Sequence, residues 1–199
     1  MSIMGIGETE PRPLTVDDLE RLPEDGDRYE LVCGRLDVSP APKPAHGRAE
    51  HRLAWCLESA CPPGFEIFQG TGIDLNADRT HHRIPDLSVF GDKSLPASGY
   101  FADPPALAVE VVSPESRFRD HHTKRNEYAA FGVEWYWIVM PDPLAPSVIE
   151  FRLDGGAYRG ASESVDFDLF ETDAPFPVKL VPHWLTADDS TWKRRIGGG

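Results

Sequence analysis

The chain has 199 residues, of which 40% are hydrophobic and 27% are charged, and this composition fits one ordinary globular domain. The formal net charge of −13 argues against broad, nonspecific DNA binding, because phosphate backbones attract proteins through lysine and arginine. No apolar run approaches the ~20 residues that span a bilayer. The N-terminus lacks the basic and apolar regions of a secretory signal, so we expect a cytoplasmic protein.

The first half of the chain is predicted to begin with a tail and a short helix. Residues 1–13 indicate a flexible tail, and "LTVDDL" opens a helix for which Thr15 and Asp18 form a capping pair. "RYELVCGRLDV" predicts a β-hairpin that turns at Cys33-Gly34. "HGRAEHRLAWCLESAC" predicts a longer helix, because its apolar residues recur at spacings of three and four.

The second half predicts strands around one more helix. Short strands are expected at "FEIFQ", "TGIDL", "RIPDLSVF" and "ALAVEVVS", and the helix "SRFRDHHTKRNEYAAFG" ends at Gly132. A strand at "VEWYWIVMP", a hairpin at "SVIEFRLDGGAYRG" and a last strand in "FPVKLVPHWL" follow. The strand-helix-strand unit at 106–139 implies a right-handed parallel crossover, and so an α/β domain with a mixed sheet.

Two acids stand in otherwise apolar strands. Asp86 follows Pro85, and Glu110 shares one strand face with Ala108 and Val112. If the two strands are neighbours, the two carboxylates converge and repel, and a divalent cation such as Mg²⁺ relieves that repulsion. The alternative, which the spacing by itself favours, is that each acid pairs with a nearby arginine or caps a turn.

Several segments in order resemble the Uma2 family of restriction endonucleases. The segments are "LTVDDLERLPEDGDRYELVCGRL", "SPAPKPAHGRAEHRL", "RIPDLSVF", "LAVEVVSPES" and "DHHTKRNEYAAFGVEWYWIVMP", and the resemblance covers roughly residues 14–180. It implies a restriction-endonuclease-like core of the PD-(D/E)xK superfamily: a mixed central sheet flanked by helices, with added β-hairpins. Residues 14–195 would form this single nuclease-like domain, and residues 196–199 a frayed tail.

The resemblance also implies an activity and its residues. The protein would be a Mg²⁺-dependent endonuclease that hydrolyses DNA phosphodiester bonds, with Mn²⁺ able to substitute, and would form a homodimer. Asp86 matches the aspartate of "PD" and Glu110 the second carboxylate, so both would bind the metal, together with the carbonyl of Val111. Val112 stands at the superfamily's lysine position. Lys124 matches the lysine of the family's "K…Y…GV" pattern and would orient the attacking water from a helix.

Lys124 and Glu30 each have a simpler interpretation. Lys124 is spaced for ordinary contacts within its helix, either with Asp120 or with Tyr128. Glu30 matches a family glutamate and would be an additional catalytic acid near the metal. It can equally be a half-buried hairpin residue that pairs with a neighbouring arginine, Arg28 or Arg35.

Other polar positions leave further choices open. His46 could contact phosphate, although a capping role at the start of its helix is favoured, and Ser113 is favoured as a turn residue before Pro114. Met140 occupies a position where the family often has an acid. Adjacent histidines at 81–82 and 121–122 argue poorly for zinc, since there is no CxxC and no HExxH.

The basic residues near the candidate site and the function of the protein each allow more than one interpretation. A local basic groove and scattered solvated charge are both compatible with the basic residues near the candidate site, which are Arg79, Arg83, Arg117, Arg119, Lys124 and Arg125. The alternative function is a catalytically silent nucleic-acid-binding or dimerisation module on the same fold. A metal-dependent hydrolase of another small substrate is a third possibility.

Overall fold

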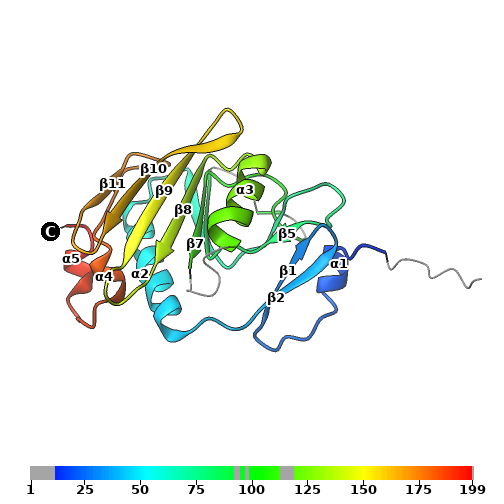
Figure 1. Cartoon of the computed structure of the whole chain (residues 1–199), viewed down its shortest axis with the longest axis horizontal. Coiled ribbons are helices and arrows are strands. Elements are labelled where there is room, and N and C mark those ends of the chain that lie inside the picture. The colour runs from blue at the N-terminus through cyan, green and yellow to red at the C-terminus, as the bar shows by residue number, and fades with distance from the viewer. Residues whose placement is uncertain (1–11, 92–94, 97–98, 113–118, 199) are drawn as a thin grey trace, which may run out of the picture.

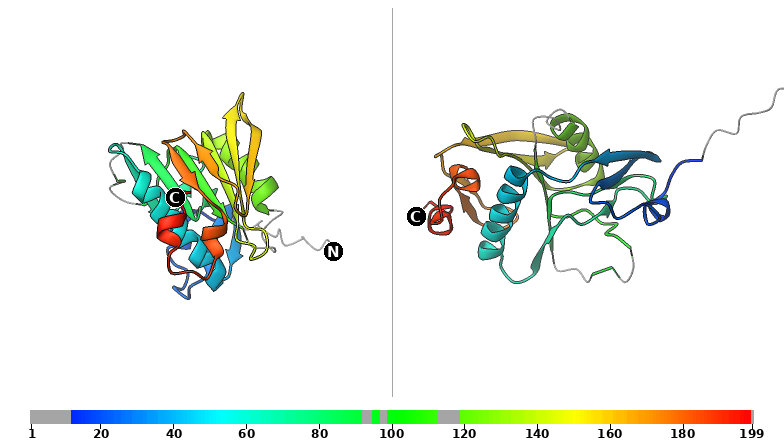
Figure 2. Two further views of the ribbon diagram at one scale, coloured as in Figure 1. Left: turned by 90° about the vertical axis from the view of Figure 1, so that its left-hand side faces the viewer. Right: turned by 90° about the horizontal axis from the view of Figure 1, so that it is seen from below.

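The structure is a computed structural model that describes residues 12–91, 95–96, 99–112 and 119–198. Residues 1–11 of the predicted N-terminal tail, Ser113 and Arg117 lie outside the described residues. The chain folds as strands and helices of an α/β protein, with α2 and the central sheet side by side in two views (Figures 1 and 2). No helix in these described segments is long and apolar enough to cross a membrane.

A mixed six-stranded sheet forms the centre of the fold (Figure 1). Its order is β10-β9-β8-β7-β6-β3, and β7 and β8 are parallel whereas the other neighbours are antiparallel. The predicted mixed α/β architecture with a parallel crossover between residues 106 and 139 is therefore confirmed. The strands are β3 (Phe65–Gln69), β6 (Leu87–Gly91), β7 (Leu107–Val111), β8 (Trp135–Met140), β9 (Ser147–Asp154) and β10 (Ala157–Val165).

Two smaller sheets flank the central one. The four-stranded sheet has the order β2-β1-β5-β4 and contains the predicted hairpin, which turns through Cys33 and Gly34 at positive φ angles of 49° and 77°. Its strands are β1 (Arg28–Val32), β2 (Arg35–Ser39), β4 (Ile73–Asp74) and β5 (His82–Arg83). The two-stranded sheet pairs β11 (Phe170–Thr172) with β12 (Val178–Leu180).

The sequence predicted one strand at "RIPDLSVF", but the structure divides this segment between two strands in different sheets. Arg83 ends β5 in the small sheet, and Leu87 begins β6 in the central sheet. Pro85 lies between them and has no N–H to donate to a strand ladder, so the chain changes sheets at this point. As a result, Asp86 lies just before β6, where the two sheets meet.

The sequence predicts the first three α-helices but not α4 or α5, and only α2 agrees closely at both ends. The helix α2 starts with Pro44 at its first position, where a missing N–H costs nothing, and α3 ends at Gly132 with a φ of 97°. Part of the second predicted helix is a π-helix, η1. The helices are α1 (Val16–Leu19), α2 (Pro44–Ala60), η1 (Arg119–Lys124), α3 (Arg125–Phe131), α4 (His183–Thr186) and α5 (Trp192–Arg195).

Strand β7 separates two hydrophobic clusters. Val109 and Val111 pack with residues of α2 on one face of the sheet, and Ala108 and Val112 pack with residues of α3 on the other. This alternation follows from the two-residue period of a strand. Val112, at the superfamily's lysine position, is a core residue with 3% of its surface exposed. Glu110 therefore faces the α3 side of a fully buried strand.

Candidate active site

Asp86 lies buried at the junction of the two sheets, where it accepts three hydrogen bonds. Its Oδ1 is 2.6 Å from a guanidinium nitrogen of Arg28 and 3.2 Å from Nε2 of His46, and its Oδ2 accepts from the backbone N–H of Val111 at 2.7 Å. Burial alone would raise the pKa of this carboxyl. The contacts with His46 and Arg28 outweigh burial and lower its pKa to about 2, so Asp86 is a carboxylate at neutral pH.

Glu110 projects from β7 towards the helix that follows it. Its Oε1 accepts a hydrogen bond from Nζ of Lys124 at 2.9 Å and one from the hydroxyl of Tyr128 at 2.7 Å. Burial, and then the charge of Glu110, raise the pKa of the Tyr128 hydroxyl well above its usual range, so this hydroxyl is a donor. Lys124 is itself buried and contacts one of the two predicted metal ligands, and its catalytic role stays a prediction.

Glu30 extends the same group of charges from the β1 hairpin. It is 1% exposed, and it binds Nζ of Lys124 at 3.3 Å, Arg83 at 3.0 Å and the backbone N–H of Ile84 at 2.8 Å. The simpler alternative paired Glu30 with Arg28 or Arg35, but the guanidinium that Glu30 binds is that of Arg83, because β1 pairs with β5. Burial alone would raise the pKa of Glu30, yet Lys124 and Arg83 lower it.

Arg83 links the small sheet to the helix of Lys124, and sequence reasoning gave it no such role. Its guanidinium donates to both carboxylate oxygens of Glu127 on α3, at 2.7 and 2.9 Å, as well as to Glu30 and, at 3.3 Å, to Asp37. Only 1% of Arg83 is exposed. A bidentate pair of this kind fixes orientation as well as charge, so Arg83 ties Glu30 and α3 to one position.

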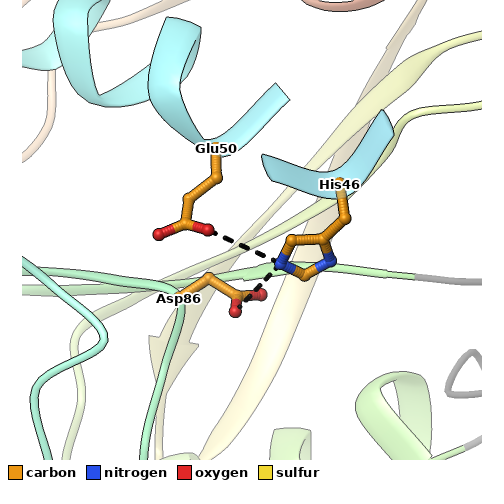
Figure 3. A group of neighbouring side chains, drawn as sticks. All are labelled: His46, Glu50 and Asp86. Atoms are coloured by element: carbon orange, nitrogen blue, oxygen red, sulfur yellow. Dashed lines mark hydrogen bonds and ion pairs between the residues drawn. The ribbon is translucent and has the colours of Figure 1, made fainter. Parts of the chain in front are cut away.

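A second possible metal-binding group includes Asp86 itself (Figure 3). His46, Glu50 and Asp86 each offer a ligand atom, and these atoms lie within 4.8 Å of one another. The favoured capping role of His46 is wrong: Lys43 is the N-cap residue of α2, and His46 lies inside the helix. Sequence reasoning missed Glu50, although its i,i+4 spacing from His46 in "HGRAE" places both on one helix face.

The surroundings of Glu50 change the pKa of its carboxyl. Burial first, and then the nearby Asp86 carboxylate, raise the pKa of Glu50 above its ordinary value. Two carboxylates that repel in this way favour a bound cation. Carboxylate oxygens suit Mg²⁺ and Mn²⁺, and the His46 imidazole adds a nitrogen donor of the kind that binds transition metals. The residues around Asp86 therefore fit a divalent cation.

Asp86 and Glu110 are brought to neighbouring strands, as the sequence hypothesis required. Strands β6 and β7 pair in the register Leu87 to Val109, so the residues just beyond that pair, Asp86 and Glu110, lie across from each other. Each acid has its own cation in the protein, Arg28 for Asp86 and Lys124 for Glu110. The two predicted ligands thus form one buried group of charges.

Several other candidates take part in structural contacts instead. Among the described side chains, His82 binds Asp74 at 2.7 Å, whereas His81 lies 3.3 Å from Glu127, so the adjacent histidines contact different acids. Met140 is half-buried at the end of β8, and the nearby Asp142 accepts a hydrogen bond from the Leu144 N–H in an exposed turn. The aromatic run 135–137 packs in the core, as predicted.

The basic residues near the site do not form an open groove where the structure describes their side chains. Arg79 pairs with Asp74 and Asp17, and Arg83 and Lys124 are buried against acids. Arg125 donates to the carbonyl of Tyr158. Three of these four cations are paired with acids, so the hypothesis of a local basic groove made by them is not supported.

Comparison with known protein families identifies the family of this chain. The Uma2 family model, described as "Putative restriction endonuclease", matches residues 16–186, which include every candidate site residue. The chain belongs to the Uma2 family. A search of curated proteins finds no match to this Uma2 protein. The family resemblance seen in the sequence is confirmed.

A solved structure shares the fold of this Uma2 protein. It is described as the crystal structure of "a putative nuclease belonging to DUF820" from Anabaena variabilis ATCC 29413. The two chains superpose with a TM-score of 0.62 at 21% sequence identity, over 81% of this chain and 90% of that one. At this identity the likeness establishes the fold, and it confirms the predicted restriction-endonuclease-like core.

Proposed function

We propose that this Uma2 protein is a metal-dependent endonuclease that hydrolyses phosphodiester bonds of DNA. Membership of the family and the shared fold support a nuclease. The observation that carries the proposal is the buried group of Asp86, Glu110 and Lys124, held together from two neighbouring strands and the helix that follows. A purely structural core rarely buries so many charges, since each must be taken out of water.

The proposed metal ligands are Asp86 and Glu110, with the Val111 carbonyl and with His46 and Glu50 beside Asp86. When bound there, Mg²⁺ would neutralise charge that develops on the phosphate and would make a bound water more acidic. Mn²⁺ is expected to substitute for Mg²⁺, because the two share a preference for oxygen donors. Arg28 holds the orientation of Asp86 through its 2.6 Å contact.

Lys124 is proposed to position the attacking water and to stabilise negative charge at the phosphorus. Its ammonium already has two acidic neighbours, Glu110 at 2.9 Å and Glu30 at 3.3 Å, which hold it in place. An ammonium has three N–H donors, which can exchange between these acids and a water or phosphate oxygen. Glu30 is therefore assigned a supporting role as an acid that positions Lys124.

Replacing Lys124 with methionine is expected to lower kcat for DNA cleavage about 10²-fold with little change in KM, because the lost interaction is made in the transition state. Steady-state cleavage of a fluorescent duplex measures both constants. Lys179→Met is the control, since that lysine is exposed and pairs with Glu171 at 2.7 Å in the β11–β12 sheet, away from the site. Unchanged kcat in a folded Lys124→Met variant would remove Lys124 from the mechanism.

The proposed function is tested by incubating the purified protein with plasmid and single-stranded DNA. Cleavage is expected with Mg²⁺ or Mn²⁺ and is expected to stop when EDTA removes the metal. Calorimetry on the same preparation measures Mn²⁺ binding, which should weaken in a His46→Ala or Asp86→Asn variant. Cleavage that persists in EDTA would contradict a metal-dependent reaction.

One observation favours a second function. Because Arg28 and Lys124 neutralise Asp86 and Glu110, the fold satisfies these charges by itself. A catalytically silent nucleic-acid-binding or dimerisation module would look the same. It would bind DNA with no dependence on Mn²⁺ and would release no product. The homodimer and the cytoplasmic location stay predictions from the sequence.

A further inference from the structure

The last helix carries a concentration of positive charge on an acidic chain. Within α5, Lys193, Arg194 and Arg195 are consecutive and exposed, with no acid among them. The whole chain has a net charge of −13. This helix begins beyond residue 186, where the match to the family model ends. The charge run is therefore a feature of this chain outside the segment on which its family membership rests.

Apolar and aromatic contacts fix α5 against the domain. Trp192 packs edge-on against Trp55 of α2 with ring centroids 5.3 Å apart, and the guanidinium carbon of Arg52 lies 4.8 Å from the centre of the Trp192 ring. Ile196 has 1% of its surface exposed. One of the cations also contacts an aromatic ring, since Lys193 Nζ lies 5.7 Å from the centre of the Trp55 ring. The charges are thus held on a fixed surface rather than on a free tail.

The helix that anchors α5 also reaches the candidate site. His46 and Glu50 lie in the first turns of α2, and Arg48 lies between them in sequence. The Arg48 side chain points towards α4 and donates a hydrogen bond to the carbonyl of Thr186. Of this side chain, 46% is exposed. In Figures 1 and 2, α4 and α5 lie alongside α2. The helix that carries two of the candidate metal ligands therefore also carries Arg48 and anchors α5 through Trp55.

We infer that this cationic cap, defined as Arg48, Lys193, Arg194 and Arg195, binds the DNA phosphate backbone beside the bond that is cleaved. The inference rests on the proposed function, since it assigns the surface that holds the substrate of that site. Charge complementarity supports a polyanion as the occupant, because Lys193, Arg194 and Arg195 are exposed side by side on a chain that is otherwise acidic. Two acids adjoin the cap, Asp188 at 3.9 Å from Arg48 and Asp189, whose carboxylate accepts from the Thr191 N–H.

DNA binding across a salt series tests the cap. The double variant Lys193→Gln/Arg194→Gln removes two exposed cations and leaves the buried Trp192 anchor in place. A labelled duplex is titrated with each protein by fluorescence anisotropy at 50 to 200 mM KCl, with EDTA present so that the DNA stays intact. We expect about tenfold weaker binding at the lowest salt. The slope of log affinity against log salt should fall by about 2, because each phosphate contact contributes about 0.9.

The matched control is Arg21→Gln/Arg159→Gln, which makes the same change in net charge at two exposed arginines outside the cap, in the turn after α1 and on β10. If both double variants bind alike, or if the protein binds no DNA at any salt, the cap is not a DNA surface. Metal-dependent cleavage by the unaltered protein reports separately on the proposed function. Cleavage together with equal binding by the two double variants would overturn the cap and leave the endonuclease standing.

Discussion

Replacing Asp86 with asparagine is expected to reduce metal-dependent DNA cleavage on the order of 10²–10³-fold, the loss typical of removing one preorganised charge from a reaction site. The substitution keeps the shape of the side chain and an oxygen that can accept the Val111 N–H. It removes the negative charge that now binds Arg28 and His46 and that would bind a divalent cation. Initial rates on a supercoiled plasmid at saturating Mg²⁺ measure the loss.

Asp74→Asn is the matched control for this variant. Asp74 is also buried, and it also binds a histidine and an arginine, His82 at 2.7 Å and Arg79 at 2.9 Å. It lies on β4, which is not a neighbour of β7 in either sheet. A folded Asp74→Asn protein should cleave at close to the normal rate. If both variants lose activity alike, or if Asp86→Asn cleaves normally, Asp86 has no special part in the chemistry.

Replacing Arg83 with methionine is expected to lower the free energy of unfolding by about 3–5 kcal/mol, the usual cost of leaving buried charges without their partner. Methionine fills a similar volume, so the loss reports charge rather than packing. Glu30 and Glu127 would both lose a guanidinium that now lies within 3.0 Å of them. Urea denaturation at pH 7 measures the change. Arg125→Met is the control, because Arg125 donates to a carbonyl and lies 4.5 Å from the Phe151 ring.

The effect of Arg83→Met should also depend on pH. Burial alone would raise the pKa of Glu127, yet His81 and Arg83 lower it from 4.5 to about 2. A carboxyl with a lowered pKa stabilises the fold fully above its unfolded value and loses that contribution as the pH falls through its folded value. The difference between the native protein and Arg83→Met should therefore be full above pH 4.5 and shrink between pH 4.5 and about 2. A difference that grows on acidification would contradict the ion-pair account.

The sequence by itself determined the local elements of this protein and its family. Alternation in "LAVEVV" placed Glu110 and Val112 on one strand face, the spacing in α2 predicted its helix, and Gly132 marked the end of α3. These features follow from short-range geometry, in which the period of a strand or helix is written directly in the order of residues. The family motifs likewise pointed to Asp86, Glu110 and Lys124 as a group.

Only the tertiary structure decided which charges meet. Arg83 lies 53 residues from Glu30 and 44 from Glu127 in sequence, and no local pattern distinguishes it from other arginines. The contact exists because β5 pairs with β1 while α3 packs on the face of the central sheet that carries Glu110. Likewise, the break at Pro85 moved Asp86 to the junction of two sheets, beside His46 and Glu50. Buried charges select their partners by the topology that surrounds them, since each must be paired wherever the fold removes it from water.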